Sequence, residues 1–321
     1  MKVNSLIKNT KAYKIFSGDK KNNTLSHATL IVCDDSELLE TYLKVFCKTL
    51  MCESIDFCDN CRVCRLIDSK QFEDVKFYPE DGKIKTKDVD DLVEKSYLKP
   101  LESDKKLFVL VNAQEMNAQS QNKLLKTLEE PPKNTYIILG ATSTYTLLPT
   151  LLSRVKRLDI LPFTDEEILS CLESDYTDYE KLKTAVSVCN GVVSEAIKKY
   201  QDDEIKVIEN LVYDIFTKMK SSKDVAFYSS KINKNNIKDV IAVSSRLISD
   251  LLRYKSVDNT LNKITSNKIE VIKDLYTVGA LLQFSEKLRE IEKSLYFNGN
   301  IQAVSDLLLF GLLEGKYKWS K

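Results

Sequence analysis

Residues 107–111 (Leu-Phe-Val-Leu-Val) form an unbroken apolar run. A strand of this composition is typically covered on both faces, as the strands of parallel sheets are. Similar short runs occupy residues 28–33 (ATLIVC), 75–78 (VKFY) and 136–141 (YIILGA). Because segments with helical periodicity separate these runs, we expect residues 1–164 to form an α/β domain around a parallel sheet.

The helices of this domain can be placed from their apolar spacing and their end signals. We expect one helix at residues 36–51 and another at 117–128. The second should end before Pro131, because proline lacks an amide proton and blocks the preceding helical turn. Thr86 is expected to cap a third helix, which has its apolar residues on one face.

The pattern changes after Pro162, beyond which only helical periodicity is found. Thr164 and Glu167 have the spacing of a capping box, which marks a helix start. Apolar residues at i, i+3, i+4 and i+7 then recur to the C-terminus. We therefore expect a small helical domain at 165–206 and a helical bundle at 207–321.

Charge and hydropathy restrict the classes of partner. The chain has 321 residues, and its 48 basic residues nearly balance 47 acidic ones. No global basic field therefore indicates nucleic-acid binding. The chain begins without an apolar leader, and its apolar runs are too short to cross a bilayer. We expect a cytoplasmic protein without membrane contact.

Four of the eight cysteines, Cys52, Cys58, Cys61 and Cys64, fall within residues 52–64, here called the cysteine loop. Cytosolic thiols stay reduced, which argues against disulfides. Four thiolates on a short loop suit a tetrahedral zinc ion, and a site without an open position is structural. The cysteine loop is therefore expected to bind a structural zinc ion.

Other interpretations of the cysteine loop stay open at this point. The four cysteines could share no role, Cys58 and Cys61 could be a redox pair, or Cys47 could replace Cys52 as a ligand. The three remaining cysteines are expected to be small core residues. They are Cys33, Cys171 and Cys189.

The loop after the first expected strand lacks the residues that hold a nucleotide. A phosphate loop reads G-x-x-x-x-G-K-[ST], but residues 32–40 contain neither glycine nor lysine. Asp34, Asp35 and Glu37 would repel a triphosphate there. After the run at 107–111, no acidic pair that would bind magnesium is found: Glu115 is either a remnant of one or, as we favour, a solvated residue at a helix start. We expect no ATP binding by the chain itself.

Three segments resemble one family. Residues 118–132 (AQSQNKLLKTLEEPP), 147–154 (LLPTLLSR) and 26–28 (SHA) are similar to segments of bacterial DNA polymerase III clamp-loader subunits, which have the AAA+ fold. The cysteine loop stands where those subunits insert a zinc module. The resemblance favours the delta-prime type over the gamma/tau ATPase, because a motor subunit needs an intact phosphate loop.

The resemblance implies roles for particular residues. Arg154 would act in trans as an arginine finger on the ATP of a neighbouring subunit, and Ser153 would support it. Partners would be gamma/tau and delta, with the sliding clamp and primed DNA reached through the complex. The helical domain at 165–206 would be a lid, and the bundle at 207–321 would be a collar that serves oligomerisation, unless it packs only within the chain. Val155 replaces the cysteine of the family motif, and Ser194 stands where an active ATPase carries arginine.

Two other functions remain as alternatives. The chain could be an ATP-hydrolysing gamma/tau-like subunit, or a zinc-dependent nucleic-acid-binding protein outside clamp loading. The second would need a basic cysteine loop, but acidic residues balance Arg62 and Arg65 there. We expect no intrinsic enzyme activity, only membership of a DNA polymerase holoenzyme. His27, the single histidine, is expected to be structural.

Overall fold

The computed structural model divides into two compact units. It describes residues 2–54, 56–202, 204–256, 269, 271–296 and 300–318. The first unit contains Met1–Thr177 and Gly191–Glu195, and the second contains Asp178–Asn190 and Ala196–Lys321. The three-domain division at residues 164 and 206 stays a prediction.

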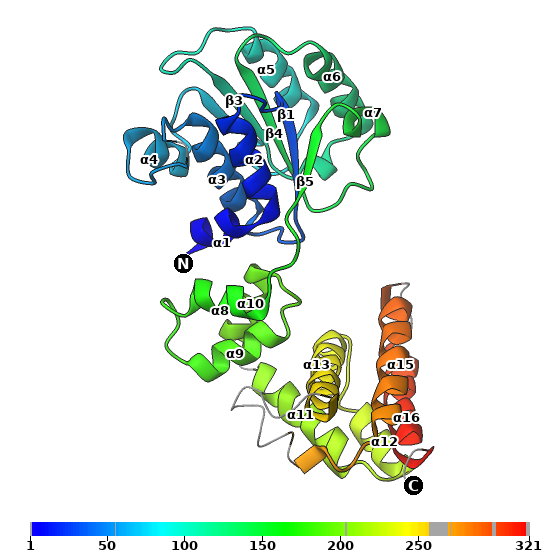
Figure 1. Ribbon diagram of the computed structural model, residues 1–321. Coiled ribbons are helices and arrows are strands. Elements are labelled where there is room, and N and C mark those ends of the chain that lie inside the picture. Colours follow the sequence, from blue (N-terminus) through cyan, green and yellow to red (C-terminus); the bar gives the residue numbers. More distant parts are fainter. Residues whose placement is uncertain are drawn as a thin grey trace. The chain divides into compact units, whose positions relative to one another are not determined.

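A parallel sheet forms the centre of the first unit (Figure 1). In the described part of the chain it has five strands in the order β2-β3-β4-β1-β5, and every neighbouring pair is parallel. The strands are β1 (Ala28–Val32), β2 (Val75–Tyr78), β3 (Lys106–Leu110), β4 (Thr135–Ala141) and β5 (Lys156–Asp159). The expected α/β class with a parallel sheet is confirmed, and all four segments predicted as strands are strands.

Helices cover both faces of the sheet, because side chains along a strand alternate in direction. Ile137 and Leu139 of β4 pack in one core with α5 (Thr86–Ser96), α6 (Ala118–Glu129) and α7 (Pro149–Leu152). Gly140, between Leu139 and Ala141, faces Leu43 of α3 (Leu39–Met51) on the other side. The remaining elements of this unit are α1 (Val3–Asn9), α2 (Lys11–Lys21), α4 (Arg62–Asp68), the 3-10 turn η1 (Ala113–Glu115) and α8 (Asp165–Leu172).

Gly140 lets α3 approach the sheet closely. A Cβ on Gly140 would lie 2.5 Å from Leu43 Cδ1 and 3.1 Å from Leu39 Cδ1. We expect Gly140→Ala to lower the free energy of unfolding by about 1–3 kcal/mol through overpacking. Gly18→Ala is the control, because no atom lies within 4 Å of its Cβ position in α2. It should stabilise by up to about 1 kcal/mol through helix propensity.

Urea unfolding followed by circular dichroism measures both changes. A midpoint for Gly140→Ala at or above the wild-type value would contradict the close packing of α3 on β4.

One expected cap is confirmed and one is wrong. Thr164 caps α8, and the Glu167 carboxylate accepts a hydrogen bond from the Thr164 amide at 2.8 Å. Thr86, however, is the first residue of α5, not its cap. The side-chain contact at the start of α5 comes from Asp88 instead, because its carboxylate accepts a hydrogen bond from the amide of the N-cap residue Lys85 at 2.6 Å.

The second unit is helical in its described residues. Its helices are α9 (Tyr179–Ser187), most of α10 (Val193–Gln201), α11 (Glu204–Lys218), α12 (Ser222–Ser229), α13 (Ile237–Ser256), α15 (Val278–Tyr296) and α16 (Ile301–Lys318). Phe216, Tyr276 and Phe284 are in contact inside its core, and the Tyr276 hydroxyl donates to the Phe216 carbonyl at 2.9 Å. None of the described helices is long and apolar enough to cross a membrane.

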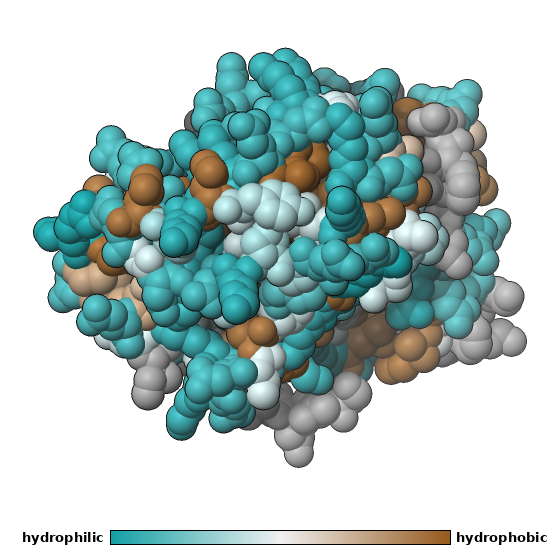
Figure 2. Space-filling model, turned by 90° about the horizontal axis from the view of Figure 1, so that it is seen from above, coloured by the Kyte–Doolittle hydropathy of each residue, from teal (hydrophilic) through white to brown (hydrophobic). Residues whose placement is uncertain are grey.

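Hydrophobic residues are scattered over the face drawn in Figure 2. They form small groups separated by hydrophilic residues. Apolar atoms normally contribute more than half of a folded surface, so small groups of this kind need no partner. This face therefore identifies no docking surface.

Candidate functional site

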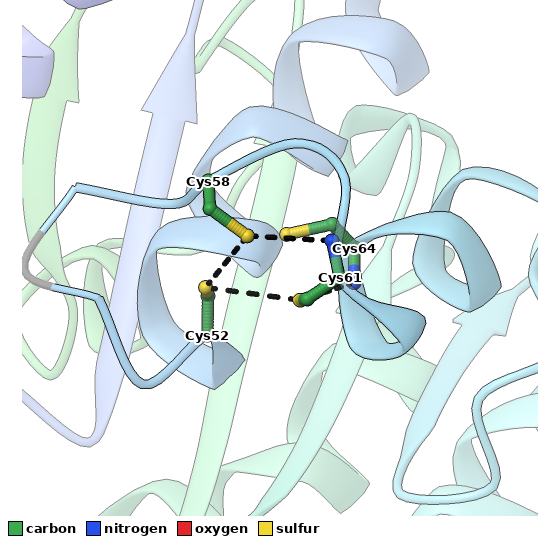
Figure 3. Close-up of side chains that lie close together, drawn as sticks. All are labelled: Cys52, Cys58, Cys61 and Cys64. Carbon is green, nitrogen blue, oxygen red and sulfur yellow. Dashed lines mark hydrogen bonds between the residues drawn. The ribbon is translucent and has the colours of Figure 1, made fainter.

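The structure brings the four cysteines of the cysteine loop together (Figure 3). Cys52 directly follows α3, Cys58 lies in the connecting loop, and Cys61 and Cys64 lie at the start of α4. Their four Sγ atoms all lie within 4.8 Å of one another. Cys47 is fully buried on α3 and is not part of this group, so it does not replace Cys52.

The spacing of the sulfur atoms fits a metal ion. Four thiolates at ~2.3 Å from a tetrahedral zinc ion would be about 3.8 Å apart. The Cys52 Sγ atom lies 3.9 Å from Cys58 Sγ and 4.0 Å from Cys61 Sγ. The group could therefore hold a metal ion, and four thiolate donors would leave no position open for water.

The backbone of the cysteine loop prepares some of its thiols for ionisation. The pKa of the Cys58 thiol is lowered to about 6, because the amides of Asn60 and Cys61 donate to its sulfur. Burial, in contrast, raises the pKa of Cys64. A metal ion must displace the proton of each thiol that it binds. Cys58 is thus the thiol most readily available as a first ligand.

Two lysines hold the cysteine loop against the helices beside it. Lys48 of α3 is 2% exposed, and its Nζ atom lies 2.5 Å from Asp59 and 3.1 Å from Asp68. Lys20 of α2 donates to the Cys52 carbonyl at 2.8 Å. Four thiolates and a divalent ion would carry a net charge of −2, and the Lys20 ammonium would offset part of it, because Lys48 is already paired with two carboxylates.

The connection from β1 to α3 is the segment that lacks phosphate-loop residues, and the place of Asp35 in it differs from expectation. Asp35 is 4% exposed and does not face solvent. One carboxylate oxygen accepts from the Leu38 amide at 3.0 Å. The other accepts from the Tyr42 hydroxyl and the Ser194 amide, each at 3.0 Å. The acidic group is therefore an internal hydrogen-bond acceptor.

The cleft at this position is too small for a nucleotide. It has a volume of about 10 Å³, close to the space of one water molecule. Pockets for small ligands typically measure about 300–1,000 Å³. Its lining comes from three segments: residues 33–35, 160–163 and 191–192. Glu115, the possible magnesium-binding remnant, is exposed on η1.

Arg154 lies just beyond α7 with its side chain 34% exposed. Its Nη2 atom lies 2.5 Å from a carboxylate oxygen of Glu129, at the end of α6. Its Nη1 atom donates to the Thr150 carbonyl at 2.7 Å and to the Ser153 hydroxyl at 3.3 Å. The guanidinium is therefore held in place by its neighbours while part of it faces solvent.

The single histidine is structural, as expected. The Nε2 atom of His27 donates to the Leu128 carbonyl at 2.8 Å, which joins the entry to β1 with the end of α6. Val155 packs against the core beneath α5, α6 and α7. Neither residue belongs to the cysteine group.

Known proteins share these segments. A family model described as DNA polymerase III, delta subunit, matches residues 8–164. DNA polymerase III subunit delta' of Bacillus subtilis (strain 168) is 30% identical over 172 residues, which cover 53% of this chain and 52% of that protein. Subunit delta' of Haemophilus influenzae is 25% identical over 295 residues, 89% of each chain. The gamma/tau subunit of Mycoplasma genitalium is 32% identical over 146 residues, 44% of this chain and 24% of that protein.

Residues 8–164 of the chain match the DNA polymerase III clamp-loader family. The cysteine group and Arg154 both lie inside the residues that the clamp-loader model matches. The chain spans about half the length of its Bacillus relative and about a quarter of the Mycoplasma one. The match therefore rests mainly on the first unit.

Proposed function

We propose that this chain is a delta-prime-type clamp-loader subunit that hydrolyses no ATP itself. Arg154 would complete the ATP site of a neighbouring subunit, and Ser153 would help to position it. One observation carries the proposal: Arg154 presents a partly exposed cation, while the chain's own phosphate position is filled by Asp35. Such a subunit can assist catalysis only at another subunit's nucleotide.

The chemistry of phosphoryl transfer suits this role. Negative charge on the γ-phosphoryl oxygens is stabilised by a guanidinium brought in from outside the pocket. The pair between Arg154 and Glu129 lies at the surface, where ion pairs contribute ~0–1 kcal/mol. Exchange of Glu129 for a phosphate group would therefore cost little.

The partners follow from the family. We assign gamma/tau and delta subunits as direct partners, with the sliding clamp and primed DNA reached through the complex, in the cytoplasm. The helices of the second unit support a hetero-oligomer, because Leu282 of α15 and Leu307 and Phe310 of α16 are 53%, 50% and 42% exposed. Apolar side chains of this kind suit burial against a sibling subunit.

The cysteine group would hold a structural zinc ion, with Cys52, Cys58, Cys61 and Cys64 as ligands. A separate nucleic-acid-binding function is less well supported, because acidic residues of the cysteine loop are paired with side chains of α2 and α3. Asp59 pairs with Lys48, and Asp56 accepts from the Tyr13 hydroxyl at 2.7 Å. These contacts attach the loop to the first unit and present no basic surface for phosphates.

The isolated chain should not bind Mg–ATP. Isothermal titration calorimetry with millimolar Mg–ATP is expected to give no binding heat, because the cleft beside Asp35 has no room for a phosphate chain. A gamma/tau subunit titrated in the same buffer is the positive control. Tight binding together with ATP cleavage by the isolated chain would favour the gamma/tau-like alternative.

A further inference from the structure

The residues around Asp35 form an anion-binding site that is filled by the chain itself. Asp35 lies in the connection from β1 to α3, three residues after Val32, where a phosphate-binding loop would run. Its carboxylate accepts from the amide of Leu38, just before α3, and from the amide of Ser194, the second residue of α10. Amides at the start of helices favour anions, because they have no partner within the helix.

We propose that Asp35 is a built-in anion that replaces a ligand phosphate and locks the segment Gly191–Glu195 onto the start of α3. The Leu38 amide donates to one oxygen of the Asp35 carboxylate, and the Tyr42 hydroxyl and the Ser194 amide donate to the other, each at 3.0 Å. The carboxylate is therefore held from two sides. Bonds from neutral donors to an ionised acceptor are stronger than those between neutral groups.

Tyr42 and Cys33 lie beside the Asp35 carboxylate, and both stay protonated at neutral pH. Burial raises the pKa of the Tyr42 hydroxyl, and the Asp35 carboxylate raises it further. The hydroxyl therefore stays protonated and can donate. Burial also raises the pKa of the Cys33 thiol to about 12. The carboxylate thus meets no second anion at neutral pH.

Gly191 lets the backbone of the segment Gly191–Glu195 pack closely against Pro162 and Phe163. Its φ is +80°, and a Cβ there would lie 2.6 Å from Pro162 Cβ and 2.7 Å from the Phe163 carbonyl oxygen. The Phe163 amide donates to the Gly191 carbonyl at 2.9 Å. Only glycine fits this backbone without strain. The segment is therefore built to bring the Ser194 amide onto Asp35.

This lock goes beyond the proposed function, because it describes how the first unit is held together and does not depend on Arg154. A conformation set by an internal carboxylate needs no bound nucleotide. The lock would exist even if Arg154 proved to have no partner, so its test is separate from that of the arginine.

Asp35→Ala tests the lock by chemical rescue. In chloride buffer its melting temperature should fall by about 8 °C or more below that of Asp34→Ala, an exposed neighbour with the same change of charge. Formate or inorganic phosphate at equal ionic strength should then raise the melting temperature of Asp35→Ala by several degrees. Wild type and Asp34→Ala should show no such difference between chloride and formate.

Asp35→Asn keeps the side-chain volume and covers the case in which the alanine variant does not fold. Hydrogen exchange of the Ser194 amide should be at least about tenfold faster in Asp35→Asn than in wild type or in Asp34→Asn. Wild-type exchange at Ser194 would overturn the lock. So would a folded Asp35→Ala that melts like Asp34→Ala, or one that responds equally to chloride, formate and phosphate.

Discussion

Arg154→Ala should lower the ATP turnover of a reconstituted clamp loader by at least about tenfold while the complex still assembles. The side chain lies at the surface and contacts Glu129, Thr150 and Ser153, so its loss leaves no buried group unpaired. The effect is therefore expected on the rate of phosphoryl transfer and not on folding. Steady-state phosphate release in the presence of clamp and primed DNA measures it.

Two further variants separate the arginine finger from a general effect of charge. Arg157→Ala removes an exposed arginine on β5 that pairs with Asp159, and it should leave turnover within about twofold of wild type. Arg154→Lys keeps the charge but loses the planar fork of donors, so it should restore only part of the rate. Unchanged turnover with Arg154→Ala would remove the trans role from the proposal.

Cys64→Ser should abolish metal binding and lower the melting temperature of the first unit by roughly 10 °C or more. Metal binding to a site of this kind contributes directly to folding, and each kcal/mol corresponds to about 2–4 °C in a unit of this size. Cys47→Ser is the matched control, because both thiols are fully buried but only Cys64 belongs to the group of four. It should retain about one zinc per chain by elemental analysis.

A chelator provides the second arm of this experiment. It should lower the melting temperature of wild type and Cys47→Ser towards the value of Cys64→Ser, and leave Cys64→Ser unchanged. A wild-type protein that contains no metal, yet melts well above Cys64→Ser, would contradict the zinc assignment.

The sequence alone predicts most of the sheet, because four of its strands are short and mainly apolar segments. Strand β5 could not be predicted in this way. It reads Lys-Arg-Leu-Asp and buries only Leu158, because it pairs with β1 alone at the edge of the sheet. Pairing of this kind depends on a neighbouring strand and leaves little trace in composition.

The candidate site could likewise be predicted only in part. The four cysteines lie within a few residues of one another, so local spacing was enough to group them. The lock at Asp35 could not be predicted, because its partner Ser194 is 159 residues away in the chain. The only signal in the sequence is an acidic residue where a phosphate loop would have glycine or lysine, and taken alone that residue indicates repulsion of a ligand, not a substitute for one.

The buried ammonium of Lys48 determines how reversible metal loading can be. It joins α3 to Asp59 inside the cysteine loop and to Asp68 at the end of α4, and neither ion pair uses a thiol. Without a bound metal, these two ion pairs would still hold the middle of the loop and the end of α4 against α3. The four sulfur atoms then stay near one another, so the protein can recapture an ion without searching again for its fold.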